Sequence, residues 1–355
     1  MKVFSTSLFF ILSSVISSAQ VKPAHTVICI LENRAYNNIV GNVQAPYINS
    51  ILSNAHTALL TNSFGLTHPS QPNYLLLYSG ATQGVTNNNV PTGLPFTTLN
   101  LGSSLISNNL GFIGYSEDLP SVGSTVITSG AYVRKHNPWV NWQGTGTNSV
   151  PAASNRPFSD FPTDYNLLPT VSIVVPNLDN DMHDGSIATG DTWLRNNLDG
   201  YVQWCINNNS LFILTFDEDD NSSGNHILTS FTGEDVKGGS YGQHITHHNI
   251  LRTVEDLYQL PYAGASADST AVSGIWLSAQ TLTYTFIGNG NWNDLANWSG
   301  TVKPPRNTYT GSKIVIDNVV GGKCIVNVPY SVSAGTTLDV KPGSNLQVNG
   351  NLVVN

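Results

Sequence analysis

Three short and almost continuously apolar runs constrain the fold of this 355-residue chain more than any other feature. They are Val27 to Leu31, Val171 to Val175 and Leu211 to Phe216. Runs of this length that are apolar at nearly every position are typical of strands buried on both faces of a sheet. Each run is followed by acidic residues, so the sequence predicts buried strands that end at carboxylates.

Helix-like stretches alternate with these strand-like runs. They are Ala45 to Asn54, Thr192 to Asn207 and Asn249 to Gln259. From about residue 24 to residue 276 this alternation predicts an α/β fold, built as an α/β/α sandwich. We therefore expect one main domain over residues 20–277.

The composition changes after Leu277. Alternating Val, Ile, Thr, Asn and Gly form short strand-like runs without a helical period. This pattern predicts a small all-β module over residues 278–355, either a β-helix or a β-sandwich. The segment from Phe286 to Trp298 and the short runs after it resemble small modules attached to exported proteins, so this module is a candidate for binding a cell surface or a glycan.

The first nineteen residues predict an export signal. Lys2 precedes the mainly apolar stretch Leu8 to Ile16, and small residues end the segment before Gln20. No other stretch of the sequence is long and apolar enough to span a bilayer. We therefore expect a protein that is secreted, periplasmic or held at the cell surface.

Charge and cysteine content exclude two further classes. The formal net charge is −8 and the sequence contains no basic stripe, which argues against nucleic acid as a bulk electrostatic partner. The three cysteines do not suggest a disulfide framework. Cys29 and Cys205 fall in a strand-like and a helix-like stretch, where small core residues are expected, and Cys324 falls in the β module.

The segment from Thr67 to Gly80, THPSQPNYLLLYSG, places a hydroxyl at the start of an expected helix. Ser70 can cap that helix, and Pro72 suits its first turn. The start of a helix offers unpaired N–H groups and a partial positive charge, which favour a phosphoryl group. Ser70 is therefore a candidate nucleophile, although capping alone would also explain it.

Acidic and amide side chains follow the three apolar runs. Glu32 and Asn33 follow the first, Asp217 and Glu218 follow the last, and Asp179 with His183 follow the middle one. In open α/β sheets ligands gather at the carboxyl ends of strands, so we expect these groups to converge. Converging carboxylates repel one another unless a cation lies between them, and oxygen ligands with imidazole suit a divalent metal ion. The competing interpretations are a solvated turn at residues 217–220 and a helix cap at Glu32.

Six blocks of the sequence occur in the order found in a known family. They are ENRAY from Glu32, THPSQPNY from Thr67, YVRKHNPW from Tyr132, NDMHDGS from Asn180, FDEDDNSSGNH from Phe216 and ILRTVED from Ile250. Together they resemble the bacterial and fungal phosphoesterase family of secreted acid phosphatases and phospholipases C. That family is similar to the alkaline phosphatase superfamily, so the resemblance implies an alkaline-phosphatase-like α/β/α sandwich.

The resemblance implies a role for each matching residue. Ser70 corresponds to the family's nucleophile, and Asn73 to an amide that steadies a phosphoryl oxygen. The ligands of the metal that binds this nucleophile would be Glu32, Asn33, Ser70, Asp217 and Glu218. A second metal ion would be held by Asp179, His183 and His247, with His248 as an alternative to His247. The candidate contacts to phosphate or leaving group are His68, Lys135, His136 and His226, although Lys135 and His136 could equally line a loop.

Three functions from different classes follow from these assignments. The first is a secreted, metal-dependent phosphoesterase of the acid-phosphatase type, which hydrolyses small phosphate monoesters through a phosphoenzyme at Ser70 and uses one or two divalent metal ions. The second is a phosphodiesterase of the phospholipase C type, with phospholipid as substrate. The third is a non-catalytic protein that binds a surface, which the β module suggests and the intact Ser70 disfavours.

Overall fold

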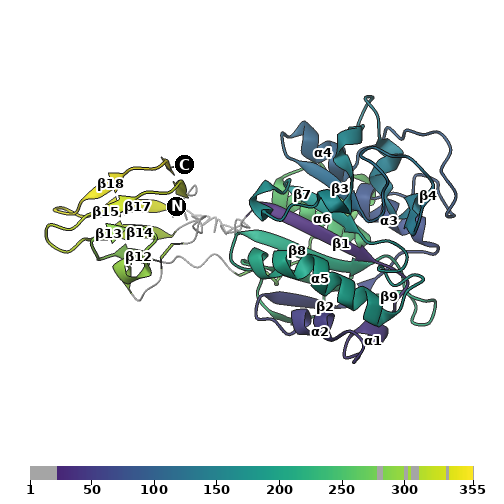
Figure 1. Cartoon of the computed structure of the whole chain (residues 1–355), viewed down its shortest axis with the longest axis horizontal. Coiled ribbons are helices and arrows are strands. Elements are labelled where there is room, and N and C mark those ends of the chain that lie inside the picture. The colour runs from purple at the N-terminus through teal and green to yellow at the C-terminus, as the bar shows by residue number, and fades with distance from the viewer. Residues whose placement is uncertain (1–21, 278–282, 300–302, 305–311, 333–335, 355) are drawn as a thin grey trace, which may run out of the picture. The chain divides into compact units, whose positions relative to one another are not determined.

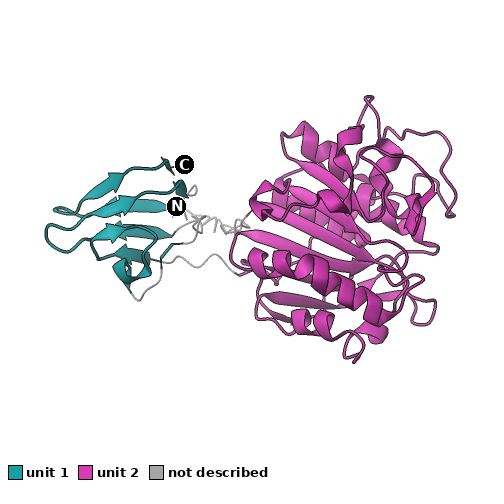
Figure 2. Ribbon diagram, in the orientation of Figure 1, with its two compact units in different colours: residues 1–20, 278–355 teal, residues 21–277 magenta. Residues whose placement is uncertain are grey.

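A computed structural model describes residues 22–277, 283–299, 303–304, 312–332 and 336–354. The chain divides into two compact units, residues 21–277 and a unit that contains residues 278–355 (Figure 2). The predicted export signal at residues 1–19 lies outside the described residues. None of the described helices is long and apolar enough to cross a membrane.

A nine-stranded sheet lies at the centre of the larger unit (Figure 1). Its strand order is β10-β2-β9-β8-β1-β7-β3-β6, and β11 also pairs with β2. β9 runs antiparallel to both of its neighbours, and the other pairs are parallel. The strands are β1 (His25–Leu31), β2 (Thr57–Phe64), β3 (Phe112–Ser116), β6 (Asn155–Pro157), β7 (Val171–Val175), β8 (Ser210–Phe216), β9 (His226–Gly233), β10 (Gly239–Tyr241) and β11 (Ile245–Thr246).

Helices cover both faces of this sheet, with α5 in front and α6 behind in the view of Figure 1. One layer contains α1 (Tyr36–Ile39), α2 (Pro46–Leu52) and α5 (Ile187–Cys205), and the other contains α3 (Ser70–Ser79), α4 (Leu101–Ser107) and α6 (His247–Tyr258). The alternation of side chains along β1 explains both layers. Val27, Cys29 and Leu31 pack under the first set of helices, whereas Ile28 and Ile30 pack under the second. The predicted α/β/α sandwich is confirmed.

Short elements connect the layers. A small hairpin pairs β4 (Thr128–Ser129) with β5 (Tyr132–Val133). The 3-10 helices are η1 (Arg134–His136), η2 (Pro138–Trp142), η3 (Ala152–Ser154), η4 (Phe158–Asp160), η5 (Tyr165–Leu167) and η6 (Gly264–Asp268). Because η1 follows β5 directly, the hairpin determines the position of Lys135 and His136, which lie in η1.

The second unit contains strands in three small parallel sheets. Their orders are β12-β14-β17, β13-β15-β18 and β16-β19. The strands are β12 (Thr283–Phe286), β13 (Gly290–Asn291), β14 (Lys313–Ile316), β15 (Cys324–Val326), β16 (Tyr330–Val332), β17 (Thr337–Val340), β18 (Leu346–Val348) and β19 (Leu352–Val354), with one 3-10 helix, η7 (Leu295–Asn297). Successive strands stacked in parallel are the arrangement of a β-helix, whereas sandwiches are antiparallel. Trp292 and Trp298 pack edge to face in its core, with ring centroids 4.8 Å apart.

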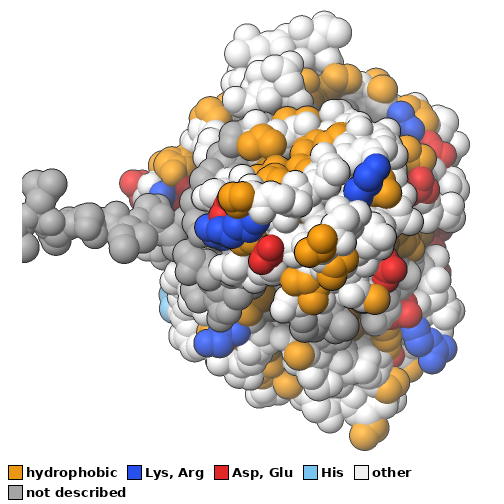
Figure 3. Space-filling model, turned by 90° about the vertical axis from the view of Figure 1, so that its left-hand side faces the viewer, with side chains coloured by type: hydrophobic (Ala, Val, Ile, Leu, Met, Phe, Trp, Pro, Cys, Tyr) orange, Lys and Arg blue, Asp and Glu red, His pale blue; other side chains and the backbone are white. Residues whose placement is uncertain are grey.

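The three cysteines are buried, as the sequence predicted for Cys29 and Cys205. Cys29, Cys205 and Cys324 are buried free thiols. On the face drawn in Figure 3, the Lys and Arg side chains lie apart from one another among hydrophobic, acidic and other atoms.

Candidate active site

The register of β1 and β8 brings two acidic pairs together. Leu31 lies opposite Phe216 in this parallel pair, so Glu32 and Asp217 leave neighbouring strands at the same level. The backbone N–H of Asn33 donates to Asp217 Oδ1 at 3.1 Å, which ties the two strand ends to each other. Asn33 adopts a left-handed conformation with φ of 51°, which asparagine tolerates better than most residues.

Ser70 lies between carboxylates from both strand ends. Its Oγ is 3.1 Å from Glu32 Oε2 and 3.1 Å from Glu218 Oε1, and all three side chains are buried. A hydroxyl has one proton and can donate to only one of these acceptors at a time. The carboxylate oxygen that does not receive this proton must carry a proton of its own, accept from another donor or meet a cation.

The start of α3 differs from the expectation that Ser70 caps it. Pro69 occupies the cap position and makes no cap hydrogen bond with its side chain, and Ser70 is the first helical residue. The N–H of Gln71 donates to Asn88 Oδ1 at 3.1 Å, and Pro72 has no N–H. The helix start consequently has fewer donors available for a ligand than the sequence suggested, and the Ser70 hydroxyl is directed to carboxylates.

A second group of potential metal ligands adjoins the first at Glu32. Among the described residues, ligand atoms of Glu32, His136 and Asp181 lie within 4.8 Å of one another, and all three side chains are buried. His136 Nε2 is 3.1 Å from Glu32 Oε1, and His136 Nδ1 is 3.3 Å from Asp181 Oδ2. None of these four atoms has a partner in hydrogen-bonding geometry. Buried polar atoms normally have partners, so convergent atoms without them indicate a place for a cation.

The trio expected to hold a second metal ion is not brought together. Asp179 is exposed, and Asp181, two residues later, is the buried carboxylate beside His136. His183 Nδ1 is 2.7 Å from Asp184 Oδ1, and its Nε2 is 3.4 Å from Lys135 Nζ. His247 Nε2 donates to the carbonyl of Phe216 at 3.0 Å, so this histidine braces the end of β8. Asp181, and not Asp179, is therefore the candidate ligand beside His136.

Burial and mutual repulsion shape the electrostatics of the site. Burial, followed by the neighbouring carboxylates, raises the pKa of Glu32 and of Asp217 well above its usual range. Burial is also the main cause that raises the pKa of Asp181 and of Glu218. Burial lowers the pKa of His136, which keeps its imidazole neutral and able to bind a metal ion. Carboxylates that are costly to ionise and a neutral imidazole fit a divalent cation that would replace their protons.

The remaining candidates surround this centre. His68 lies at its exposed side, with Nδ1 2.8 Å from Glu218 Oε2. Asn73 Nδ2 donates to the carbonyl of Thr67 at 2.7 Å and lies 3.3 Å from Glu218 Oε2, so the amide also holds the segment before α3. Lys135 is half-buried. Its positive charge offsets part of the rise that burial causes in the pKa of Glu32 and of Glu218. His226 stacks on Tyr36 and bonds the carbonyl of Thr61, which assigns it to packing.

Sequence reasoning did not include Asp181 among the candidate metal ligands, and it placed His136 among the candidate phosphate contacts. The local sequence offers Asp179, Asp181 and Asp184 around one histidine, and spacing does not tell them apart. Their burial differs because the backbone N–H of Glu32 donates to the carbonyl of Asp181 at 2.8 Å. This bond holds Asp181 against the carboxyl end of β1. The one available sequence signal was that Asp181 directly precedes an apolar residue, Met182.

Known proteins with similar sequences are phosphatases. The chain is 48% identical over 258 residues to phosphatidylinositol-3-phosphatase of Mycobacterium tuberculosis, covering 71% of this chain and 83% of the relative. It is 31% identical over 325 residues to phosphate-repressible acid phosphatase of Penicillium chrysogenum, covering 80% and 76%. These relatives, together with the α/β/α fold and the buried hydroxyl among carboxylates, define a hydrolase that acts on phosphate esters.

The family follows from a match to residues 44–261, which fit the model of the Phosphoesterase family. The chain belongs to this family, and the resemblance seen in the six sequence blocks is confirmed. Among solved structures, a protein in the alkaline phosphatase superfamily from Vibrio parahaemolyticus is similar over 68% of this chain and 67% of its own, with 11% identity and a TM-score of 0.48.

Proposed function

We propose that this phosphoesterase is a metal-dependent phosphomonoesterase that forms a phosphoserine at Ser70. One observation supports the proposal most strongly: a buried hydroxyl oxygen lies 3.1 Å from carboxylate oxygens of both Glu32 and Glu218. Such an arrangement serves no evident packing purpose, because it places repelling charges around a weak donor. It is useful where a cation and a phosphate are to meet at that oxygen.

The residues that would hold a cation at Ser70 are the two strand-end pairs and the hydroxyl itself: Glu32, Asn33, Ser70, Asp217 and Glu218. A second cation, or an extended site, would use Glu32, His136 and Asp181. A divalent ion bound at these positions would lower the pKa of the Ser70 hydroxyl and offset the charge of the incoming phosphate. The proposal leaves the metal and the choice between one and two ions to measurement.

The chain's own residues account for the movement of the proton and the leaving group. The Ser70 proton passes to Glu32 or Glu218, whose carboxylate oxygens lie 3.1 Å from the Ser70 oxygen. The Ser70 oxygen forms a bond to phosphorus while the bond to the ester oxygen breaks. His68, at the exposed side, supplies a proton to the departing alcohol. Water then attacks the phosphoserine in a second step, and phosphate leaves with Ser70 restored.

Lys135 and Asn73 would bind the phosphoryl oxygens. The ammonium group of Lys135 is a cation already close to the carboxylates, and its position beside His183 lets it meet a dianionic terminal phosphate. A monoester offers that dianion, whereas a diester has only one negative charge. This difference favours phosphate monoesters as substrates.

A lipid-linked monoester is the second candidate substrate. The 48% identical relative is named as a phosphatidylinositol-3-phosphatase, whose substrate is a phosphate monoester on a lipid headgroup. The same Ser70 chemistry would serve a soluble ester and a phosphoinositide. We also propose that the protein acts outside the cytoplasm, on the basis of the export signal expected at residues 1–19.

The test combines metal analysis with a substrate panel. Purified protein is assayed for bound metal and for phosphate release from chromogenic monoesters, soluble phosphoinositides and diesters, with Ser70→Ala and Ser79→Ala as a matched pair. Ser79 is a buried serine at the other end of α3 whose hydroxyl donates to the carbonyl of Leu75 at 2.9 Å. We expect Ser70→Ala to lose monoester turnover by at least about 10³-fold, of the order seen when a nucleophile is removed, and Ser79→Ala to retain it. Equal activity of the two variants would refute the role of Ser70.

A further inference from the structure

The loop from Asn177 to Gly185 contains Asp181 and His183, and hydrogen bonds from residues outside the loop hold its conformation. Met182, between these two residues, has a φ of 78°, which is unfavourable for a residue with a side chain. Arg34 holds the second half of the loop, with Nη2 donating to the carbonyls of Met182 at 2.8 Å and Gly185 at 3.1 Å. The first half has a different anchor.

That anchor is Glu117, the residue that follows β3. Its Oε2 accepts from the backbone N–H of Asn177 at 2.9 Å, and both carboxylate oxygens lie 3.0 Å from Asn180 Nδ2. Its Oε1 also accepts from the indole Nε1 of Trp193 at 2.8 Å. One carboxylate therefore joins three elements, namely the end of β3, the loop and α5. Hydrogen bonds to a charged acceptor are roughly twice as strong as neutral ones.

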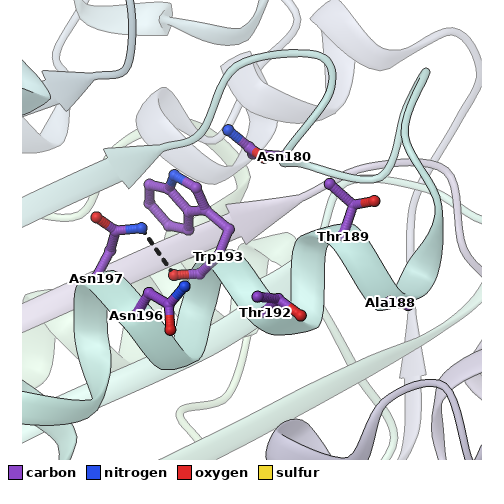
Figure 4. A pocket seen from close by; sticks show the side chains of 7 residues that line it. All are labelled: Asn180, Ala188, Thr189, Thr192, Trp193, Asn196 and Asn197. Atoms are coloured by element: carbon purple, nitrogen blue, oxygen red, sulfur yellow. Dashed lines mark hydrogen bonds between the residues drawn. The ribbon is translucent and has the colours of Figure 1, made fainter.

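The partners of Glu117 are held by further contacts on α5 and within the loop. Asn180 and Trp193 line a hollow of about 440 Å³ over α5, and Figure 4 shows Asn180 on the loop next to the Trp193 side chain. Asn177 Oδ1 in turn accepts the backbone N–H groups of Asp179 and Asn180 at 3.1 Å each. The Glu117 carboxylate thus fixes the backbone directly before Asp181.

We propose that Glu117 is a positioning residue that sets the place of Asp181 beside Glu32 and His136. Glu117 touches none of these three ligand atoms, and acts through the loop. The inference rests on the proposed metal-dependent function and adds to it the residue that fixes one ligand. Groups that orient metal ligands in this way typically change metal affinity by about 10- to 100-fold when they are altered.

Glutamine is the informative replacement at this position. Both oxygens of Glu117 accept from N–H groups, whereas an amide keeps one oxygen and turns an NH₂ group toward a donor. Glu117→Gln therefore preserves size and packing but breaks the anchor in either orientation. The matched control is Glu234→Gln, because Glu234 also accepts a backbone N–H, that of Asn209 just before β8, at the opposite end of the strand from Asp217.

The experiment is a double-mutant cycle read by calorimetric titration of the metal-free protein with Zn²⁺. The proteins are wild type, Glu117→Gln, Asp181→Asn, the double variant and Glu234→Gln. We expect Glu117→Gln to bind Zn²⁺ at least about tenfold more weakly, Glu234→Gln to bind as wild type, and the double variant to bind no more weakly than Asp181→Asn alone. Saturating Zn²⁺ should restore kcat of Glu117→Gln toward the wild-type value, which loss of fold would not allow.

Two results would overturn the inference. One is wild-type Zn²⁺ affinity in Glu117→Gln, and the other is a double variant whose loss is the product of the two single losses, since independent sites behave in that way. If wild type binds Zn²⁺ but hydrolyses no ester, the proposed function fails while the titrations still decide the role of Glu117. If wild type does not bind Zn²⁺, the inference fails as well.

Discussion

Asp181→Asn should stabilise the metal-free protein, although it alters a buried hydrogen-bonded residue. In the absence of a cation, ligand oxygens of Asp181 and Glu32 lie within 4.8 Å of each other. Two full charges at this separation repel by about 3 kcal/mol at an effective dielectric constant of about 20. The raised pKa values of both groups mean that protons already relieve part of this repulsion, so the figure of about 3 kcal/mol is an upper limit.

The asparagine keeps the local hydrogen bond, because its oxygen can still accept the backbone N–H of His183 as Asp181 Oδ1 does at 2.8 Å. We expect the free energy of unfolding at pH 8 with chelator to rise by up to about 3 kcal/mol, or roughly 6 to 12 °C in Tm. Urea unfolding monitored by circular dichroism measures the first quantity, and calorimetry measures the second. Added Zn²⁺ or Mn²⁺ should stabilise the wild type far more than the variant.

The control is Asp191→Asn, a buried carboxylate that accepts the backbone N–H groups of Tyr47 and Ile48 at the start of α2. The Asp191 carboxylate lies beside backbone N–H groups at the start of a helix and not beside other acids. Loss of its charge should therefore destabilise the protein with or without metal. A metal-free Asp181→Asn protein that is as destabilised as Asp191→Asn, with an unchanged response to metal, would refute the electrostatic reasoning.

Three further outcomes are expected. Metal must displace protons from carboxylates whose pKa values are raised, so the gain in Tm on adding Zn²⁺ should grow from pH 5 to pH 8; a gain that is larger at pH 5 would contradict this. Burial raises the pKa of Glu255 to about 7, so the folded state favours the protonated side chain. The stability that Glu255 contributes is therefore lost as the pH rises from 4.5 through 7. Relative to Glu255→Gln, the wild type should lose about 2 to 3 kcal/mol of unfolding free energy between pH 5 and pH 8 in urea titrations, and parallel pH profiles would exclude this role. Gly185→Ala would place a Cβ 1.7 Å from the carbonyl oxygen of Asp179, so Zn²⁺ affinity should fall by more than about tenfold, while Gly146→Ala, which meets nothing within 4 Å, should leave the titration unchanged.

The parts of the fold that the sequence predicted well are those governed by continuous local patterns. The apolar run of β1 implied burial on both faces, and the structure packs Val27 and Ile28 under opposite helix layers. The same reasoning placed Glu32 and Asp217 at the carboxyl ends of strands, and parallel register then brought them together. Whether the C-terminal module is a β-helix or a sandwich depended on strand pairing, which alternation alone does not determine.

The parts of the site that were harder to predict depend on loops and on contacts between distant residues. Asp179 and Asp181 are equivalent by composition, and contacts from a distant segment decide which one is buried. The N–H of Glu32 donates to the carbonyl of Asp181, and Arg34 holds the left-handed turn at Met182. Glu117 has no signal in its own sequence neighbourhood, because its partners Asn180 and Trp193 come from distant segments. The sequence predicted Ser70 as a helix cap and candidate nucleophile because the start of a helix is a local signal, whereas the sheet sets its carboxylate partners.

The stereochemical course at phosphorus tests the proposed Ser70 mechanism most directly. Each in-line displacement inverts the configuration, so two successive steps through a phosphoserine restore it. With a monoester made chiral by oxygen isotopes, we predict that the released phosphate retains its configuration. Inversion would show that water attacks the ester directly, and would contradict a phosphoenzyme at Ser70.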